Sequence, residues 1–276
     1  MYTLNCKGKL LVIENPLVMG IVNATPDSFY DQYPKKGLEA IIELAEKMIS
    51  EGADMLDIGG QSTKPGSMPV SADDEAARVL PVIQLLIEKY PDIILSVDTY
   101  YSQVATAAIN AGVAIVNDIS AGNMDAAMLA TVASLQVPYV CMHMRGTPET
   151  MQQYTTYDDV VKEVLDFFIQ KMDDCTKAGI KDIIIDPGFG FAKTIQQNFI
   201  LLKHVGIFRM LDKPILAGLS RKSTVYKTLN TTASEALNGT TVLNTLALAN
   251  GACILRVHDV KEAKEVCALF KKYNQV

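Results

Sequence analysis

Polar side chains follow short apolar runs at eight places in the chain, and their types suit the binding of a small polar ligand. The eight endings are Asn23, Asp57, Asp98, Asn117 with Asp118, His143 with Arg145, Asp186, Ser220 to Lys222, and Arg256 with His258. Asp, Asn and Ser are also ordinary turn residues, so one such ending alone could mark only a turn. Eight endings, several of them after wholly apolar runs, favour a shared site.

The endings divide into two chemical kinds. Asp98, Asn117 and Asp186 offer acceptors and an amide, which suit a small heterocycle with several N–H groups. Cations gather late in the chain, at Arg221, Lys222, Arg256 and His258. A ligand with a polar ring at one end and a phosphate group at the other would satisfy both kinds.

Apolar patterning predicts the elements that must position these residues. Runs typical of strands occupy residues 17–22, 54–59, 93–98, 114–118, 139–144, 182–186, 214–219 and 253–257. Longer segments with helical spacing alternate with them and often end near a glycine, at Gly52, Gly112, Gly179 and Gly251.

This alternation predicts an α/β protein, a (β/α)8 TIM barrel, with a short N-terminal β-hairpin around Lys7 and Gly8. A doubly wound open sheet is the alternative, because alternation alone does not distinguish closure. In a barrel, the carboxyl ends of all strands meet at one rim, which would bring the eight polar endings together.

Length and composition fit one cytoplasmic enzyme domain over residues 1–276. Hydrophobic residues make up 49% of the chain, and the net charge of −6 argues against a nucleic-acid or anionic-membrane partner. The five cysteines form no C-x-x-C pair, which favours reduced thiols. No signal peptide and no apolar run of membrane-spanning length is evident, so we expect a soluble protein.

Two segments that follow strands are longer than the usual two to six residues. Residues 23–37 and 62–74 are rich in Pro, Ser and Gly, and we interpret them as lids over the site. The alternative is that they are tolerated insertions.

Ordered motifs from Val18 to Val260 resemble those of the dihydropteroate synthases of folate biosynthesis. The motifs are GIVNATPDSF, ADMLDIGGQSTKPGS, SVDTY, GVAIVNDIS, MHMRGTP, IIIDPGFGFAKT, AGLSRKS and LRVHDV. The resemblance implies a (β/α)8 fold, a homodimer, and condensation of 6-hydroxymethyl-7,8-dihydropterin pyrophosphate with 4-aminobenzoate. The products would be 7,8-dihydropteroate and pyrophosphate, and sulfonamides would compete for the aminobenzoate site.

The resemblance also implies roles for individual residues. The pterin would contact Asp98, Asn117, Asp186 and Lys222, with Asp57 near its pyrophosphate-bearing edge and Met142 and Gly218 as further substrate-binding residues. The pyrophosphate would contact Lys64, Arg256, His258, Asn23 and the start of a helix near Val260. The aminobenzoate pocket would include Thr63, Pro65, Phe191, Lys222 and Ser223. Asn23 would ligate Mg2+, and His143 would line the pterin pocket or the barrel top.

The implied mechanism is dissociative. The bond to pyrophosphate breaks first, and the aniline nitrogen then attacks a resonance-stabilised pterin cation. Such a route needs no strong base or covalent nucleophile; it needs a neutralised leaving group and an anionic cradle for the cation. Mg2+, Arg256 and His258 would serve the first need and Asp98 and Asp186 the second, so that the expected catalytic set also includes Asn23 and Lys222.

Three positions depart from the family's common pattern. Gln61 and Lys64 stand where Glu and Arg are common, and Ala192 stands where Gly is common. Lys64 keeps a charge but lacks the planar fork of Arg, so we expect an altered affinity and a retained activity. Two other functions are the alternatives: a methyltetrahydrofolate-binding methyltransferase domain, and a pterin-binding paralogue that has no catalytic activity.

Overall fold

The computed structural model describes residues 1–25, 34–63 and 66–275. Its first element is a hairpin of β1 (Tyr2–Cys6) and β2 (Lys9–Ile13), which pair antiparallel. Lys7 and Gly8 form the turn with φ of 52° and 86°. Two residues with positive φ are typical of the type I′ turn, whose twist matches that of the flanking strands. The predicted hairpin is therefore confirmed.

Eight parallel strands form the barrel. They are β3 (Leu17–Asn23), β4 (Met55–Gly59), β5 (Ile94–Asp98), β6 (Ile115–Asp118), β7 (Tyr139–Met142), β8 (Ile183–Asp186), β9 (Leu216–Ala217) and β10 (Ile254–Val257). They lie in the order β8-β7-β6-β5-β4-β3-β10-β9. A single parallel bridge between Ile185 and Ile215, with Ile185 N donating to Pro214 O at 3.0 Å, joins the two ends.

This seam closes the barrel almost completely, so the TIM-barrel prediction is confirmed and the open-sheet alternative is wrong. Two strands are shorter than predicted by more than one residue. β7 ends at Met142, and β9 has two residues in place of the predicted 214–219. Pro214 has no amide hydrogen to give to the ladder, which fits the late start of β9.

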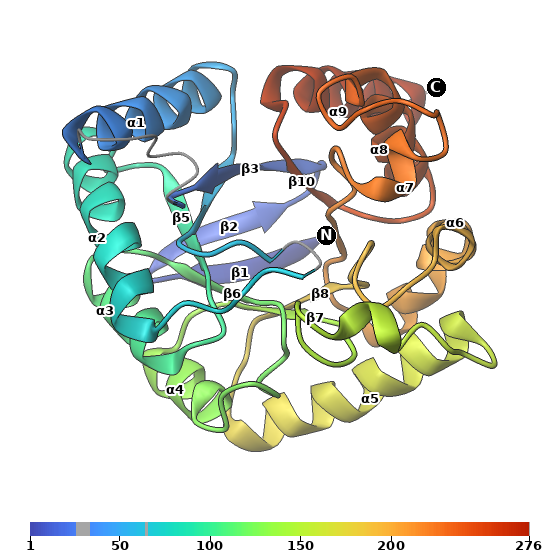
Figure 1. Cartoon of the computed structure of the whole chain (residues 1–276), viewed down its shortest axis with the longest axis horizontal. Helices are drawn as coiled ribbons and strands as arrows, with labels where there is room; N and C mark the ends of the chain where they lie inside the picture. Colours follow the sequence, from blue (N-terminus) through green and yellow to red (C-terminus); the bar gives the residue numbers. More distant parts are fainter. Residues whose placement is uncertain (26–33, 64–65, 276) are drawn as a thin grey trace.

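Helices surround the barrel in chain order (Figure 1). They are α1 (Pro34–Ser50), α2 (Ala72–Lys89), α3 (Ser102–Asn110), α4 (Met128–Leu135), α5 (Val160–Ala178), α6 (Ile195–His204), α7 (Ser223–Tyr226), α8 (Leu237–Ala249) and α9 (Val260–Tyr273), with 3-10 turns η2 (Met151–Gln153) and η3 (Val205–Leu211). The glycines predicted to follow helices do so. Gly179, for example, has φ of 97° and donates to Cys175 O and Thr176 O at the end of α5.

Side-chain caps fix the start of three helices that follow rim loops. Ser71 accepts from Asp74 N before α2, Asp159 accepts from Val161 N and Lys162 N before α5, and Thr194 forms a capping box with Gln197 before α6. The predicted ranges of the two loops, 23–37 and 62–74, extend too far at their carboxyl ends. Helix α1 already begins at Pro34 and α2 at Ala72.

The hairpin and the barrel share one apolar cluster at the amino ends of the strands. Leu4, Cys6 and Ile13 from the hairpin pack with Met19, Met55, Ile115, Val140, Ile184, Leu216 and Ile254 of the barrel. This end is therefore plugged, and the carboxyl rim is left for a site. Within the described residues, no helix is long and apolar enough to cross a membrane.

Candidate active site

An ion-pair network joins four strands at the carboxyl rim. Arg256 Nε donates to Asp57 Oδ2 at 2.6 Å, and Arg256 Nη2 donates to Asp98 Oδ2 at 2.6 Å. Asn117 Nδ2 donates to the same Asp57 oxygen at 2.8 Å. The network brings together residues from β4, β5, β6 and β10, with Asp57 fully buried in the middle of its strand.

Adjacent strand residues point to opposite faces, which separates Asn117 from Asp118. Asp118 faces away from the network and accepts from Ser120 N, Gly122 N and the Tyr139 hydroxyl, each at 2.7 Å. Of the two polar residues at this strand end, only Asn117 belongs to the site.

Burial and neighbouring charges shift the pKa values of this network. The pKa of Asp98 rises to about 7, first because the carboxyl is desolvated, while Arg256 opposes the rise and Asp57 adds to it. Desolvation lowers the pKa of Arg256, but the Asp57 and Asp98 carboxylates outweigh it, so the pKa lies above its ordinary value. Arg256 stays charged, whereas Asp98 changes charge near neutral pH.

A second cluster lies at the ends of β8 and β9. Asp186 Oδ1 accepts from Gly188 N at 2.8 Å, and Lys222 Nζ donates to Phe189 O at 2.6 Å. The Lys222 ammonium lies over the Phe191 ring, 4.7 Å from its centroid. Burial lowers the pKa of Lys222 to about 8, although the Asp186 carboxylate opposes the change.

Gly218 lies where a side chain would touch both members of the Asp186 and Lys222 pair. A Cβ at Gly218 would stand 3.5 Å from Lys222 Nζ and 3.9 Å from Asp186 Oδ2. Met142 and Phe191 belong to one buried apolar group at the same rim, together with Tyr100, Ile119, Met144, Met151 and Ala192. An apolar wall thus lies beside the polar clusters.

Asn23 ends β3 and is exposed at the rim. A Cβ on the neighbouring Gly59 would stand 3.9 Å from Asn23 Oδ1 and 3.7 Å from Asp98 Oδ2, so glycine leaves space between these two side chains. Among the described residues, no group of three or more His, Cys, Asp or Glu side chains could hold a metal. Mg2+ often takes only one or two protein oxygens and completes its shell with phosphate and water, so the exposed Asn23 amide fits it.

Of the basic residues near the carboxyl end of the chain, His258 lies at the rim site and Arg221 does not. His258 is exposed at the rim, and its ring Nδ1 lies 3.1 Å from Ser220 Oγ. Although part of the residue is exposed, its ring packs against Ser220, and its pKa falls to about 4 through desolvation first and the Arg256 charge second, so the imidazole is neutral at pH 7. Arg221 does not join the site, because Nε and Nη2 donate to Asp259 at 2.9 and 2.8 Å. Asp259 precedes α9, so the predicted anion-binding helix start already carries a carboxylate.

The second rim loop is anchored near its strand. Gln61 Nε2 donates to buried Glu75 Oε2 at 2.6 Å, and the Tyr100 hydroxyl donates to Gln61 Oε1 at 2.7 Å. Gly66 N donates to Pro148 O at 3.1 Å, which joins this loop to the one after β7. Thr63 is half-buried, and Ser223 is the half-buried first residue of α7. The predictions for Lys64, Pro65 and the lid over 26–33 lie outside the described residues.

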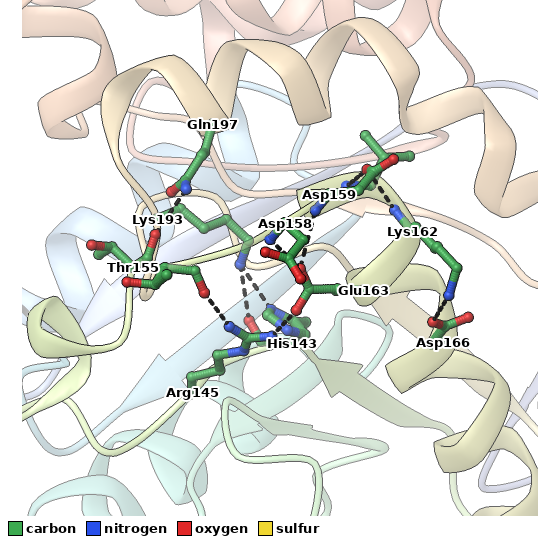
Figure 2. A network of polar contacts seen from close by, with 12 residues as sticks. His143, Arg145, Thr155, Asp158, Asp159, Lys162, Glu163, Asp166, Lys193 and Gln197 are labelled. Atoms are coloured by element: carbon green, nitrogen blue, oxygen red, sulfur yellow. Dashed lines mark hydrogen bonds and ion pairs between the residues drawn. The ribbon is translucent and has the colours of Figure 1, made fainter.

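Sequence reasoning missed a network beside the second cluster, which Figure 2 shows. Lys193 is buried and reaches His143, the residue after β7. Arg145 turns instead to Thr156 O and Glu163, and it stacks on the Tyr157 ring at 3.9 Å. A lysine in the Gly-rich segment GFGFAKT was the available signal, but no periodic pattern predicts that such a residue is buried.

Comparison with known proteins agrees with this geometry. Residues 19–258 match the family described as pterin binding enzyme. The dihydropteroate synthase of Escherichia coli K12 is 40% identical over 261 residues, which cover 94% of this chain and 92% of that protein. The folic acid synthesis protein fol1 of Schizosaccharomyces pombe is 44% identical over 268 residues. That match covers 94% of this chain but only 36% of the fission-yeast protein.

Solved structures show the same fold. The Xanthomonas albilineans dihydropteroate synthase with 4-aminobenzoic acid has a TM-score of 0.92 and 39% sequence identity. The similarity covers 99% of this chain and 98% of that one.

Proposed function

The chain belongs to the pterin binding enzyme family, among its dihydropteroate synthases. From this premise we propose which reaction the site at the carboxyl rim of the barrel catalyses. It condenses 6-hydroxymethyl-7,8-dihydropterin pyrophosphate with 4-aminobenzoate, and it releases 7,8-dihydropteroate and pyrophosphate. The observation that carries the proposal is the meeting of Asp57, Asp98, Asn117 and Arg256 in one buried network. This network offers the acceptors that a pterin ring needs, beside the cation that its leaving group needs.

The pterin binds between the two clusters. Asp98 and Asp186 accept the N–H groups of the ring, and the Asn117 amide contributes a donor and an acceptor. Asp98 can exchange the Arg256 guanidinium for the N–H groups of the pterin, because both partners are hydrogen-bond donors. This exchange turns one side of the Arg256 guanidinium toward the pyrophosphate, where a charge-assisted hydrogen bond is strong.

The chemistry is dissociative. Arg256, by its charge, and His258, as a neutral hydrogen-bond donor, stabilise the negative charge that grows on the pyrophosphate as the C–O bond breaks. Asp98 and Asp186 stabilise the positive pterin that remains, and no side chain has to remove a proton before the bond breaks. The aniline nitrogen of 4-aminobenzoate then attacks from the side of Phe191 and Lys222, and the proton that it loses as the C–N bond forms passes to the released pyrophosphate or to water.

The aminobenzoate pocket combines an apolar wall with a cation. The Phe191 ring offers a face to the benzoate, and the Lys222 ammonium above it suits the carboxylate or the pterin carbonyl. Ser223 and Thr63 complete the pocket as hydrogen-bonding groups. Asn23 would hold Mg2+, which would supply positive charge to the pyrophosphate.

A homodimer and a cytoplasmic location complete the proposal. Exposed apolar side chains lie on α8 and on the adjoining α6 and η3 segments: Ile200, Ile207, Met210, Val242 and Leu246. An exposed apolar group of this kind is typical of a protein interface. All five cysteines are unpaired thiols, which fits a reducing compartment.

One assay tests the function. The purified chain is incubated with the pterin pyrophosphate, 4-aminobenzoate and Mg2+, and both dihydropteroate and pyrophosphate are measured. Equal amounts of the two products are expected, with no product when EDTA removes the metal. Pterin binding without product would support a binding protein, and methyl transfer from methyltetrahydrofolate would support the methyltransferase alternative.

A further inference from the structure

Lys193 is a buried ammonium group that the proposed reaction does not use. It is 4% exposed, and no salt bridge to it occurs among the described residues. Burying a charge without a partner of opposite sign is costly, and an apolar side chain of similar length would fill the same space without that cost. The position of this lysine therefore calls for a reason other than packing.

Four acceptors surround the three donors of the Lys193 ammonium; three of them are close, and the fourth, His143 O, lies farther away at 3.5 Å. Nζ lies 2.9 Å from His143 Nδ1, 3.0 Å from Phe191 O and 3.1 Å from Gly188 O. An ammonium group has three N–H bonds and no acceptor, so the imidazole accepts at Nδ1 and carries its own proton on Nε2. The His143 pKa lies well below its ordinary value, because of burial first and the Lys193 charge second. Figure 2 shows the two side chains meeting above the end of β7.

The two carbonyls belong to the segment that carries the second cluster of the site. Between them lies Phe189, whose carbonyl accepts from Lys222 Nζ at 2.6 Å. Phe191 itself places its ring under the same Nζ at 4.7 Å. Lys193 and Lys222 thus bind different carbonyls of the same short segment.

The path of this segment allows little adjustment. Gly188 has φ of 70°, and a Cβ there would stand only 2.0 Å from His143 O. Ala192 also has a positive φ, of 49°. Gly188 adopts its conformation without strain, but an alanine at positive φ needs local contacts to persist, and the Lys193 ammonium supplies two of them through Gly188 O and Phe191 O.

We propose that Lys193 is a positioning residue for the condensation. Through the carbonyls of Gly188 and Phe191, and with His143 as its third partner, it fixes the Phe191 ring and the Lys222 ammonium against each other. It thereby sets the shape of the aminobenzoate pocket. This inference rests on the proposed function, because it assigns the pocket that Lys193 supports to 4-aminobenzoate.

The test compares Lys193→Met with Lys203→Met. Lys203 is an exposed lysine on the helix that follows, so it controls for the same chemical change outside the site. Because a small misplacement of reacting groups can cost about a hundredfold, Lys193→Met should lower kcat/KM for 4-aminobenzoate by about ten- to a hundredfold. Affinity for the pterin substrate should fall by less than about threefold, because Asp98 and Asn117 keep their places.

Two results would overturn the inference. One is kinetics for Lys193→Met that equal those of Lys203→Met. The other is an equal loss toward both substrates, which would indicate general damage to the barrel.

A second pair of variants tests the contact from its other side. His143→Asn keeps an acceptor on Cγ, at the place of Nδ1, whereas His143→Leu removes it. The Leu variant should show the selective rise in KM for 4-aminobenzoate, and the Asn variant should retain most of the wild-type value. If the two behave alike, the ammonium does not act through this contact.

Direct binding separates this inference from the proposed function. Calorimetry with 4-aminobenzoate, in the presence of pterin and pyrophosphate, compares the wild type with Lys193→Met without any turnover. A wild type that makes no dihydropteroate contradicts the proposed function alone. A wild type that binds 4-aminobenzoate no more tightly than Lys193→Met contradicts the positioning role alone.

Discussion

Arg256 and Lys193 are both cations with little exposure at the carboxyl rim of the barrel, and their surroundings differ. Arg256 donates to two carboxylates, Asp57 and Asp98, each at 2.6 Å. Lys193 meets an imidazole and backbone carbonyls, and no ion pair involves it among the described residues. The pKa of Arg256 lies above its ordinary value, whereas burial takes the pKa of Lys193 well below its own.

This difference shows that the two charges do different work. Arg256 and its two carboxylates form ion pairs, and a bound substrate can replace one of these partners. Lys193 contacts backbone carbonyls, at a cost to stability that the Asp186 carboxylate offsets only in part. Removal of the first cation should therefore harm both fold and activity, whereas removal of the second should harm activity alone.

Arg256→Met should have the largest effect. It leaves two carboxylates buried without a cation, so the free energy of unfolding should fall by about 3–5 kcal/mol. Loss of a donor to the leaving group should lower kcat by about a hundred- to a thousandfold. Urea unfolding and steady-state kinetics measure the two effects, with Arg256→Lys as a variant that keeps the charge. An unchanged unfolding free energy would show that the carboxylates do not depend on Arg256.

Asp98→Asn should have the next largest effect. Replacing a charged acceptor of the pterin should weaken its binding by about ten- to a hundredfold. The wild type should lose kcat/KM as the pH falls below about 7, because protonation of Asp98 removes that acceptor. A pH profile of kcat/KM checks this, and the acidic limb should be absent in the variant. An identical limb in both proteins would assign it to another group.

Lys193→Met should leave the fold as stable as the wild type or make it more stable. The folded pKa of this lysine is lowered, so the unfolded chain binds more protons and wild-type stability rises with pH toward the ordinary lysine pKa. The variant lacks this contribution, and its advantage in melting temperature should therefore shrink as the pH rises. If Lys193→Met melted well below Lys203→Met, Lys193 would stabilise the fold as Arg256 does, which would contradict this prediction.

Glu75→Gln should have the smallest effect. Glu75 is the acidic counterpart of Lys193, since it is fully buried and bonded to the neutral Gln61 amide. Desolvation raises its pKa to about 8, so the group is neutral at pH 7 and Gln is a close substitute. Activity should stay within about twofold.

The pH dependence of stability checks this interpretation of Glu75. The wild type should lose stability as the pH rises from the unfolded pKa near 4.5 to about 8, and Glu75→Gln should not show this loss. Thermal unfolding between pH 5 and pH 8.5 measures it. Parallel curves for the two proteins would show that Glu75 is ionised in the folded state.

The sequence predicts most of the strands and helix ends, because local patterns of apolar residues and glycines determine them. Eight apolar runs give eight strands, and the glycines after helices end them as expected. Asp98, Asn117 and Asp186 were predictable because each is the last or the next-to-last residue of a buried strand. Parallel strands then force such residues to one rim, whatever their separation in the chain.

Pairings between distant residues were not predictable in the same way. Arg256 and Asp57 are 199 positions apart, and nothing local selects Asp57 over pyrophosphate as the partner of Arg256. Arg221 was grouped with the phosphate-binding cations, yet a carboxylate that follows the next strand takes its guanidinium. The burial of Lys193 was not predictable, because it depends on the carbonyls of Gly188 and Phe191 in an irregular segment. The path of such a segment has no sequence signature.

The short strand β9, which has two residues, affects where the barrel wall unfolds locally. Its contact with β8 depends on one bridge, between Ile185 and Ile215, whereas β4 pairs over its full length with both β3 and β5. A seam with so few ladder bonds should open by local unfolding at lower free energy than the rest of the wall. Amide hydrogens along this seam should therefore exchange with deuterium early. The seam lies directly below the segments that carry Phe191 and Lys222, so product escape and hydrogen exchange should respond together to mutations there.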